Sequence, residues 1–162
     1  MRRLVIAVMM MFASCACALE LPDSVKEWQC VSEHIVTLTP EANGENLGRM
    51  VYRDYVRESP KGTVQLILTE GGGTGSLYVP ERVRDAKGLT PSDSEYRLLT
   101  VSGRKSIMEH QAYMPLVLAV NVGDNVILTI ESNSLTEDEI VSFAEETLSS
   151  WSITESDSYP AR

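Results

Sequence analysis

The chain has 162 residues, a typical length for a single domain, and its 14 basic and 23 acidic side chains give a formal net charge of −9. This acidity argues against nucleic acid or an anionic membrane surface as a partner, because both are bound mainly through Lys and Arg. It is also the kind of charge that keeps an exported protein in solution.

The first 18 residues have the three parts of a secretory signal peptide. Two arginines precede an apolar run over residues 4–12, which is too short to cross a bilayer, where about 20 residues are needed. Ala16-Cys17-Ala18 then fits the small-residue pattern of a cleavage site. We expect cleavage after Ala18, export to the periplasm or the medium, and no transmembrane span in the mature chain. A buried N-terminal helix and a membrane anchor are the alternatives.

Two cysteines leave a lipid anchor open as another alternative. Bacterial lipoproteins are cut just before a cysteine that carries the lipid, and Cys15 and Cys17 each match that pattern in part. A lipid would anchor the domain to a membrane. After cleavage at Ala18, Cys30 is the only cysteine left, so it has no partner for an internal disulfide. We expect Cys30 to act as a small buried hydrophobe rather than as a nucleophile.

Three strands are predicted in the first half of the mature chain. After a lead-in over residues 19–26, β-branched and partly alternating residues predict a strand over 28–38, which ends before an Asn43-Gly44 turn. A second strand over 47–57 and a third over 63–69 are joined by a short link, which predicts an antiparallel hairpin.

Residues 70–95 have a different composition, with five of the ten glycines and two of the seven prolines. We expect a long surface loop with one short helix over residues 79–86. Long loops in compact domains are often functional, which makes Gly72 and Gly73 candidate ligand contacts. The glycine run is not a phosphate loop, because no Lys followed by Ser or Thr comes after its last glycine.

Four further strands and one helix complete the predicted domain. Residues 96–101 pair with 105–113, and residues 116–122 pair with 126–131, across short turns. Thr136 stands three residues before Glu139, which predicts a capping box at the start of a helix. An apolar stripe at helical spacing follows, formed by Ile140, Phe143, Ala144, Leu148 and Trp151.

The predicted architecture is α+β. An antiparallel β-sheet meander of about seven strands is backed by a C-terminal α-helix, within a single domain over residues 19–151. Residues 152–162 are mostly polar and are expected to form a flexible tail.

One cluster of basic residues is a candidate ligand site. Arg49, Arg53 and Arg57 are spaced by four along the second strand, so they share one face of it. With Tyr55 they are the place where we would look for an anionic ligand. The alternative is that these arginines form ion pairs with Asp and Glu of the sheet.

The two histidines, His34 and His110, are each preceded by a glutamate, and imidazole and carboxylate are common metal ligands. If their strands were neighbours, these residues could form a metal site. Adjacent residues of a strand point to opposite faces, so each pair would supply only one ligand. Surface histidines are the alternative. The chain has no Gly-x-Ser-x-Gly motif, and we assign no catalytic residue and no cofactor.

The sequences ILTIES at 127–132, LTEDEI at 135–140 and FAEETL at 143–148 resemble the closing strand and helix of PsbP-like α+β domains. They also resemble the ending of many small exported bacterial domains of unknown function. The resemblance covers residues 127–148 alone. It implies a helix-backed antiparallel sheet and a binding or assembly role more than catalysis, and it carries over no functional residue.

Three functions remain open from the sequence. The first is a non-enzymatic binding or assembly module of the cell envelope, with a small molecule or an envelope protein as its partner. The second is a small envelope hydrolase or metal-dependent enzyme that uses His34, His110 and nearby carboxylates. The third is a structural subunit, which an exposed apolar patch or a free sheet edge would mark.

Overall fold

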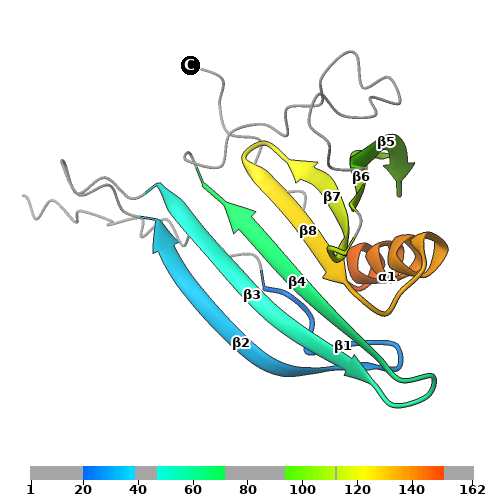
Figure 1. Ribbon diagram of the computed structural model, residues 1–162. Helices are drawn as coiled ribbons and strands as arrows, with labels where there is room; N and C mark the ends of the chain where they lie inside the picture. The colour runs from blue at the N-terminus through cyan, green and yellow to red at the C-terminus, as the bar shows by residue number, and fades with distance from the viewer. Residues whose placement is uncertain (1–19, 39–46, 72–93, 112, 152–162) are drawn as a thin grey trace, which may run out of the picture.

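The computed structural model describes residues 20–38, 47–71, 94–111 and 113–151 (Figure 1). The predicted signal peptide, the predicted helix over 79–86 and the predicted tail over 152–162 lie outside the described residues. No helix in the described part of the chain is long and apolar enough to cross a membrane.

The described residues form one antiparallel sheet and one C-terminal helix, which confirms the α+β prediction. The strands are β1 (Ser24–Val25), β2 (Trp28–Leu38), β3 (Gly48–Arg57), β4 (Gly62–Glu70), β5 (Ser94–Val101), β6 (Arg104–Gln111), β7 (Leu116–Gly123) and β8 (Val126–Ser132). The helix is α1 (Glu137–Ser150). The sheet has eight strands rather than seven, because part of the predicted lead-in forms β1, whose Val25 pairs with Trp28.

The strand order differs from that of a simple meander. It is β1-β2-β3-β4-β8-β7-β6-β5, so β4 pairs with β8 and the chain reaches β5 at the far edge of the sheet before it returns (Figure 1). Since every pairing is antiparallel, β4 and β5 run in the same direction. Strands that run in the same direction need a long crossover connection rather than a tight turn. Residues 71–93 make this connection. The strand order therefore explains why a long stretch of chain lies between β4 and β5 in the sequence.

The helix packs on one face of the sheet and completes the core there. Alternation along each strand places Val64, Leu66 and Leu68 of β4 on this helix face, and all three are buried. Phe143 of α1 lies edge-on to Trp28 and Tyr55, with ring centroids 5.4 and 5.6 Å apart. The five residues of the predicted helical stripe are all buried.

The predicted capping box is present at the start of α1. The Glu139 backbone N–H donates to Thr136 Oγ1 at 3.4 Å, and the Thr136 backbone N–H donates to Glu139 Oε2 at 2.9 Å. The helix contacts β1 and β5, the strands at the two ends of the sheet, so the sheet must curve around it. Ion pairs join α1 to both sides of this curve: Lys26–Glu146 and Arg57–Glu139 on the β1 side, and Arg97–Glu137 on the β5 side.

Candidate functional site

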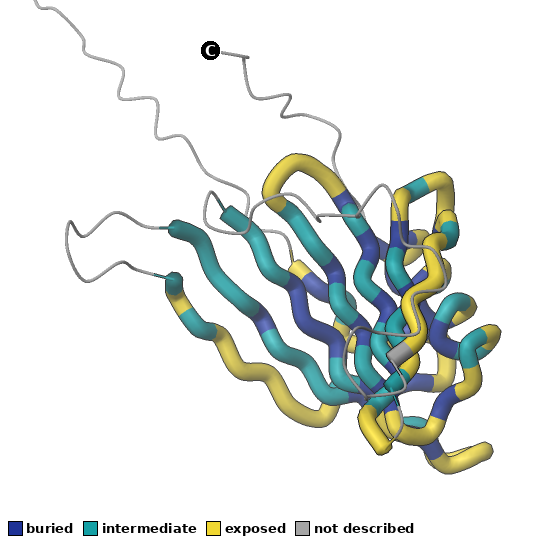
Figure 2. Tube along the Cα trace, turned by 45° about the horizontal axis from the view of Figure 1, so that its top comes forward, coloured by how far each residue is buried: buried dark blue, intermediate teal, exposed yellow. Residues whose placement is uncertain are grey.

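The face of the sheet opposite α1, here called the outer face, is the candidate site. None of the described helices or strands packs against it, and most of its residues are half-buried rather than buried (Figure 2). Ile67 at its centre is the exception, with 9% of its surface exposed. The strand register arranges the side chains of this face in rows that cross the sheet.

The first of these rows is polar. Register pairs Asp54 of β3 with Gln65 of β4, and Gln65 with Glu131 of β8. Together with their cross-strand neighbours these residues form the polar row: Ser32, Asp54, Gln65, Glu131, Val117, Glu109 and Tyr96. Three carboxylates from three different strands therefore lie along one line of the outer face.

The next row across the outer face is mainly apolar. It consists of His34, Tyr52, Ile67, Thr129, Ala119, Ile107 and Leu98, and is called the apolar row below. His34 and Tyr52 at one end have ring centroids 6.3 Å apart, and Leu98 at the other end has 44% of its surface exposed. The solvated face of an antiparallel sheet usually carries polar side chains. By comparison, this row is unusually apolar.

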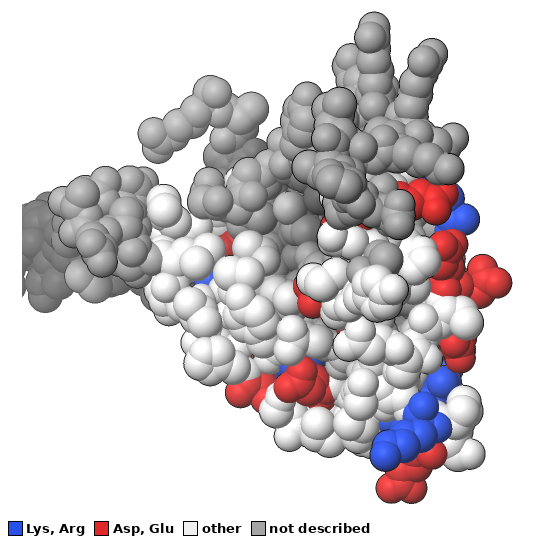
Figure 3. Space-filling view, in the orientation of Figure 1, with Lys and Arg blue, Asp and Glu red and all other residues white. Residues whose placement is uncertain are grey.

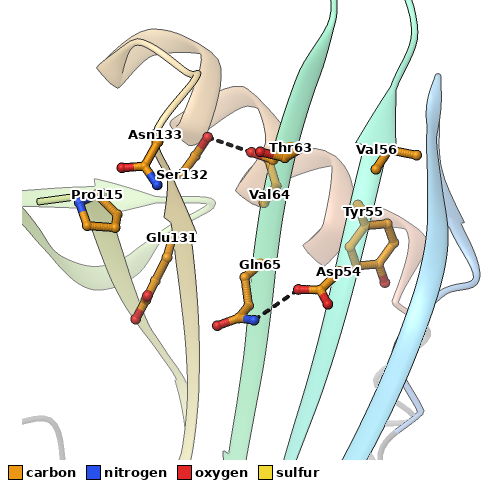
Figure 4. Close-up of a pocket in the computed structure, with 10 residues that line it drawn as sticks. All are labelled: Asp54, Tyr55, Val56, Thr63, Val64, Gln65, Pro115, Glu131, Ser132 and Asn133. Atoms are coloured by element: carbon orange, nitrogen blue, oxygen red, sulfur yellow. Dashed lines mark hydrogen bonds between the residues drawn. The ribbon is translucent and has the colours of Figure 1, made fainter.

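A depression of about 340 Å³ lies on the polar row between β3, β4 and β8 (Figure 4). Its lining includes Asp54, Gln65 and Glu131, with Pro115 and Asn133 at one end. Figure 4 shows the amide of Gln65 directed toward the carboxylate of Asp54, and Gln65 Nε2 donates to Asp54 Oδ1 at 2.9 Å.

Among the described residues, the hydrogen bonds along the polar row do not include the carboxylate of Glu131. Ser32 Oγ donates to Asp54 Oδ2 at 2.5 Å, so both oxygens of Asp54 accept a hydrogen bond. Tyr96 donates to Glu109 Oε1 at 2.9 Å, and this bond raises the pKa of Tyr96 because the carboxylate disfavours a neighbouring phenolate. The Glu131 carboxylate forms no hydrogen bond or ion pair with any other described residue. The depression therefore presents an acceptor to groups that carry N–H or positive charge.

The arginines of the predicted basic patch lie on the other side, the helix face, and share it as the spacing predicts. Arg49 Nε lies 2.5 Å from Glu70, Arg53 Nε lies 2.6 Å from Glu33, and Arg57 Nη1 lies 2.9 Å from Glu27. Arg57 also stacks over the Trp28 ring at 4.5 Å. These contacts match the alternative prediction, in which the arginines form ion pairs with Asp and Glu. An anionic ligand would have to displace a carboxylate from each guanidinium.

Tyr55, the aromatic member of that patch, is fully buried on the helix face. Its hydroxyl donates to the Pro22 carbonyl at 2.5 Å. Burial raises the pKa of Tyr55 to about 12, because the charged phenolate is disfavoured away from water. The side chain therefore anchors the lead-in segment to the sheet rather than facing solvent.

The two histidines are not brought together. His34 is on β2 and faces the outer side, whereas His110 is on β6 in line with Met108 of the helix face, and four strands separate β2 from β6. Among the residues that the structure describes, no three His, Cys, Asp or Glu side chains gather to hold a metal ion. His110 lines a second depression of about 290 Å³ with Glu137, but the Glu137 carboxylate is paired with Arg97.

Two other predicted features remain to be placed. Gly72 and Gly73 lie outside the described residues. Cys30 is half-buried and packs against the core, and its Sγ lies 3.2 Å from the Ser32 carbonyl. The sequence predicts a small buried hydrophobe, and the structure meets this expectation in part, since Cys30 contacts the core but is half-buried rather than buried.

Comparisons with protein-family models, with curated proteins and with solved structures found no match for this chain. The resemblance of residues 127–148 to PsbP-like domains therefore stays a prediction.

The polar row is the feature that sequence reasoning missed. Alternation along single strands did carry part of the signal, since Gln65 lies between buried Val64 and Leu66, and Glu131 follows buried Ile130. The missing information was the register between strands far apart in sequence, above all the pairing of β4 with β8 that sets Gln65 opposite Glu131.

Proposed function

We propose that this chain is an exported, non-enzymatic binding module of the cell envelope that holds its partner against the outer face of the sheet. The observation that supports this most is the outer face itself, where an apolar row lies beside a polar row on a side that no described element covers. Apolar surface rimmed by polar groups is typical of interaction sites, and on this face Leu98 is exposed while Tyr52, Ala119 and Ile107 are half-buried.

The chemistry of the two rows favours a protein partner over a small molecule. The rows extend over seven strands, whereas sites for small molecules enclose most of the ligand in a cleft. Asp54, Glu109 and Glu131 favour a partner that presents Lys or Arg beside apolar side chains. Figure 3 shows one side of the molecule, where uncharged atoms cover much of the described surface and acidic groups lie chiefly along its margin.

The export part of the proposal rests on the sequence of residues 1–18, with its arginines, short apolar run and cleavage pattern. The enzymatic alternative would need a histidine beside carboxylates that are free to act. His34 and His110 lie on opposite faces, and the carboxylate that shares the His110 depression is ion-paired, so no observation favours that alternative.

Site-specific photo-crosslinking in the living envelope tests the proposal. A benzophenone amino acid in place of Tyr52, on the apolar row, should give a discrete crosslinked product with another envelope protein. The matched control is the same replacement at Tyr113, which is fully exposed in the turn between β6 and β7 and belongs to neither row. Equal products from both positions, or none from Tyr52, would count against the outer face as the binding surface.

A further inference from the structure

The edge strand β2 offers a long unpaired edge. On its open side β1 pairs only with Trp28 and Gln29, and no other described strand pairs with the rest of β2 on that side. Natural sheets protect such edges with Pro, Lys or very short strands, because free N–H and C=O groups invite another strand. Between residues 31 and 38 this edge has neither Pro nor Lys, and its one Asp or Glu, Glu33, is ion-paired with Arg53 of the neighbouring strand. Val31 and Ile35 are instead 60% and 49% exposed, and Figure 2 shows much of β2 coloured as exposed.

We propose that β2 is a self-association edge, through which two copies of this chain pair antiparallel about a two-fold axis at Ile35. An antiparallel pairing of two identical strands is two-fold symmetric when one residue lies opposite itself. The axis is then normal to the sheet, so both copies of α1 lie on one side and both outer faces lie on the other. The pair presents one continuous outer face of double width.

The geometry of β2 selects Ile35 as the centre. A register shift between Cys30 and Ser32 interrupts the strand, which leaves residues 32–38 as its regular part. Ile35 is the midpoint of that segment, so a centre at Ile35 pairs its whole length. A centre at His34 would run into the irregular part, and a centre at Val36 would leave Ser32 and Glu33 unpaired.

The side chains fit the same register. Ile35 meets Ile35 of the second copy, His34 meets Val36, and Glu33 meets Thr37. Cross-strand pairs of β-branched residues stabilise sheets, whereas like charges directly opposite destabilise them. In this register the two Glu33 side chains are offset by four residues, about 14 Å along the strand, which exceeds a Debye length of about 8 Å at physiological salt.

The net charge of −9 on each copy opposes association at long range. Salt screens this repulsion but leaves backbone pairing and apolar contact largely intact. The dimer should therefore strengthen as salt is raised, which is the opposite of what an ion-paired interface would show.

Sedimentation of the protein purified from the exported fraction, over a concentration series at low and high salt, tests the proposal. Wild type should form a dimer that tightens with salt. Ile35→Lys should weaken it about tenfold or more, because two ammonium groups would meet at the axis. The matched control is Met114→Lys in the turn between β6 and β7, where Met114 is 57% exposed, and it should leave the dimer unchanged. A wild-type monomer at every concentration, or equal weakening by both variants, would overturn the proposal.

Cysteine crosslinking tests the register and does not depend on the lysine variant. In a Cys30→Ser background, Ile35→Cys should oxidise to a disulfide-linked dimer. Glu33→Cys should crosslink when mixed with Thr37→Cys and not by itself. If Glu33→Cys alone crosslinks as fast as Ile35→Cys, the proposed register is wrong. A different result would be that wild type forms a complex with another protein, which Ile35→Lys abolishes. That result would show that β2 binds another partner and would also overturn self-association. The binding proposed for the outer face does not depend on either outcome.

Discussion

At the scale of single residues, Tyr55 shows how burial gives a side chain a structural task. It is fully buried against Phe143, and its hydroxyl holds the Pro22 carbonyl. Burial raises the pKa of Tyr55 from 10.0 to about 12, so the phenol ionises at a lower pH in the unfolded chain than in the folded one. Its contribution to stability is therefore complete below pH 10 and is lost as the pH rises toward 12. The shift corresponds to roughly 2 to 3 kcal/mol.

We predict that Tyr55→Phe lowers the stability at neutral pH and reduces the loss of stability at alkaline pH. At pH 7 it should lower the free energy of unfolding by about 1 kcal/mol, because the Pro22 carbonyl loses its donor. Above pH 10 the variant should lose less stability than wild type, because it has no buried phenol to ionise. Urea unfolding at several pH values measures both effects, and Tyr52→Phe is the control on the outer face. A constant difference between wild type and Tyr55→Phe across this range would contradict the account.

At the scale of elements, α1 and its cap show how much a local sequence pattern specifies. Thr136 and Glu139 form the predicted capping box, and hydrogen bonds from Thr136 together with nearby Arg57 lower the pKa of Glu139. The helix is also the element that closes the curved sheet, since it contacts both β1 and β5. Loss of its first turn should therefore be felt across the domain.

We predict that Thr136→Ala lowers the free energy of unfolding by about 1 kcal/mol, because the Glu139 backbone N–H loses its acceptor, Thr136 Oγ1. Ser142→Ala, which removes only an exposed bond to Glu146 on the same helix, is the matched control and should have little effect. Thermal or urea unfolding followed by circular dichroism measures both. An equal loss in the two variants would show that the cap contributes nothing specific.

The elements that local patterns define were predicted well, and those defined by distant pairing were not. The strand over residues 28–38 matches β2, and the predicted hairpin of strands over 47–57 and 63–69 matches the pairing of β3 with β4. The short strand β1 was missed because two residues give no periodicity, and it is defined only by the pairing of Ser24 with Gln29 and of Val25 with Trp28. The place of β5 at the far edge was missed because no local signal favours pairing of β4 with β8 over pairing of β4 with β5.

At the scale of the whole molecule, the two faces of the sheet carry different kinds of side chains. The helix face carries the core and the ion-paired arginines, whereas the outer face carries the polar row and the apolar row. The arginine spacing was visible in the sequence, but the carboxylates that pair with it come from distant segments, as Glu27 and Glu139 do for Arg57. The polar row needs all seven strands in register, so no single segment could reveal it.

The most direct test of an exported module that binds through its outer face is native mass spectrometry of the protein recovered from its own envelope. The account predicts a chain that begins at residue 19 and carries a bound partner besides any second copy. Thr129→Arg, at the centre of the outer face, should remove that partner, whereas Glu145→Arg on the exposed side of α1 should keep it. A chain that retains residues 1–18, or a partner that Thr129→Arg still holds, would contradict the account.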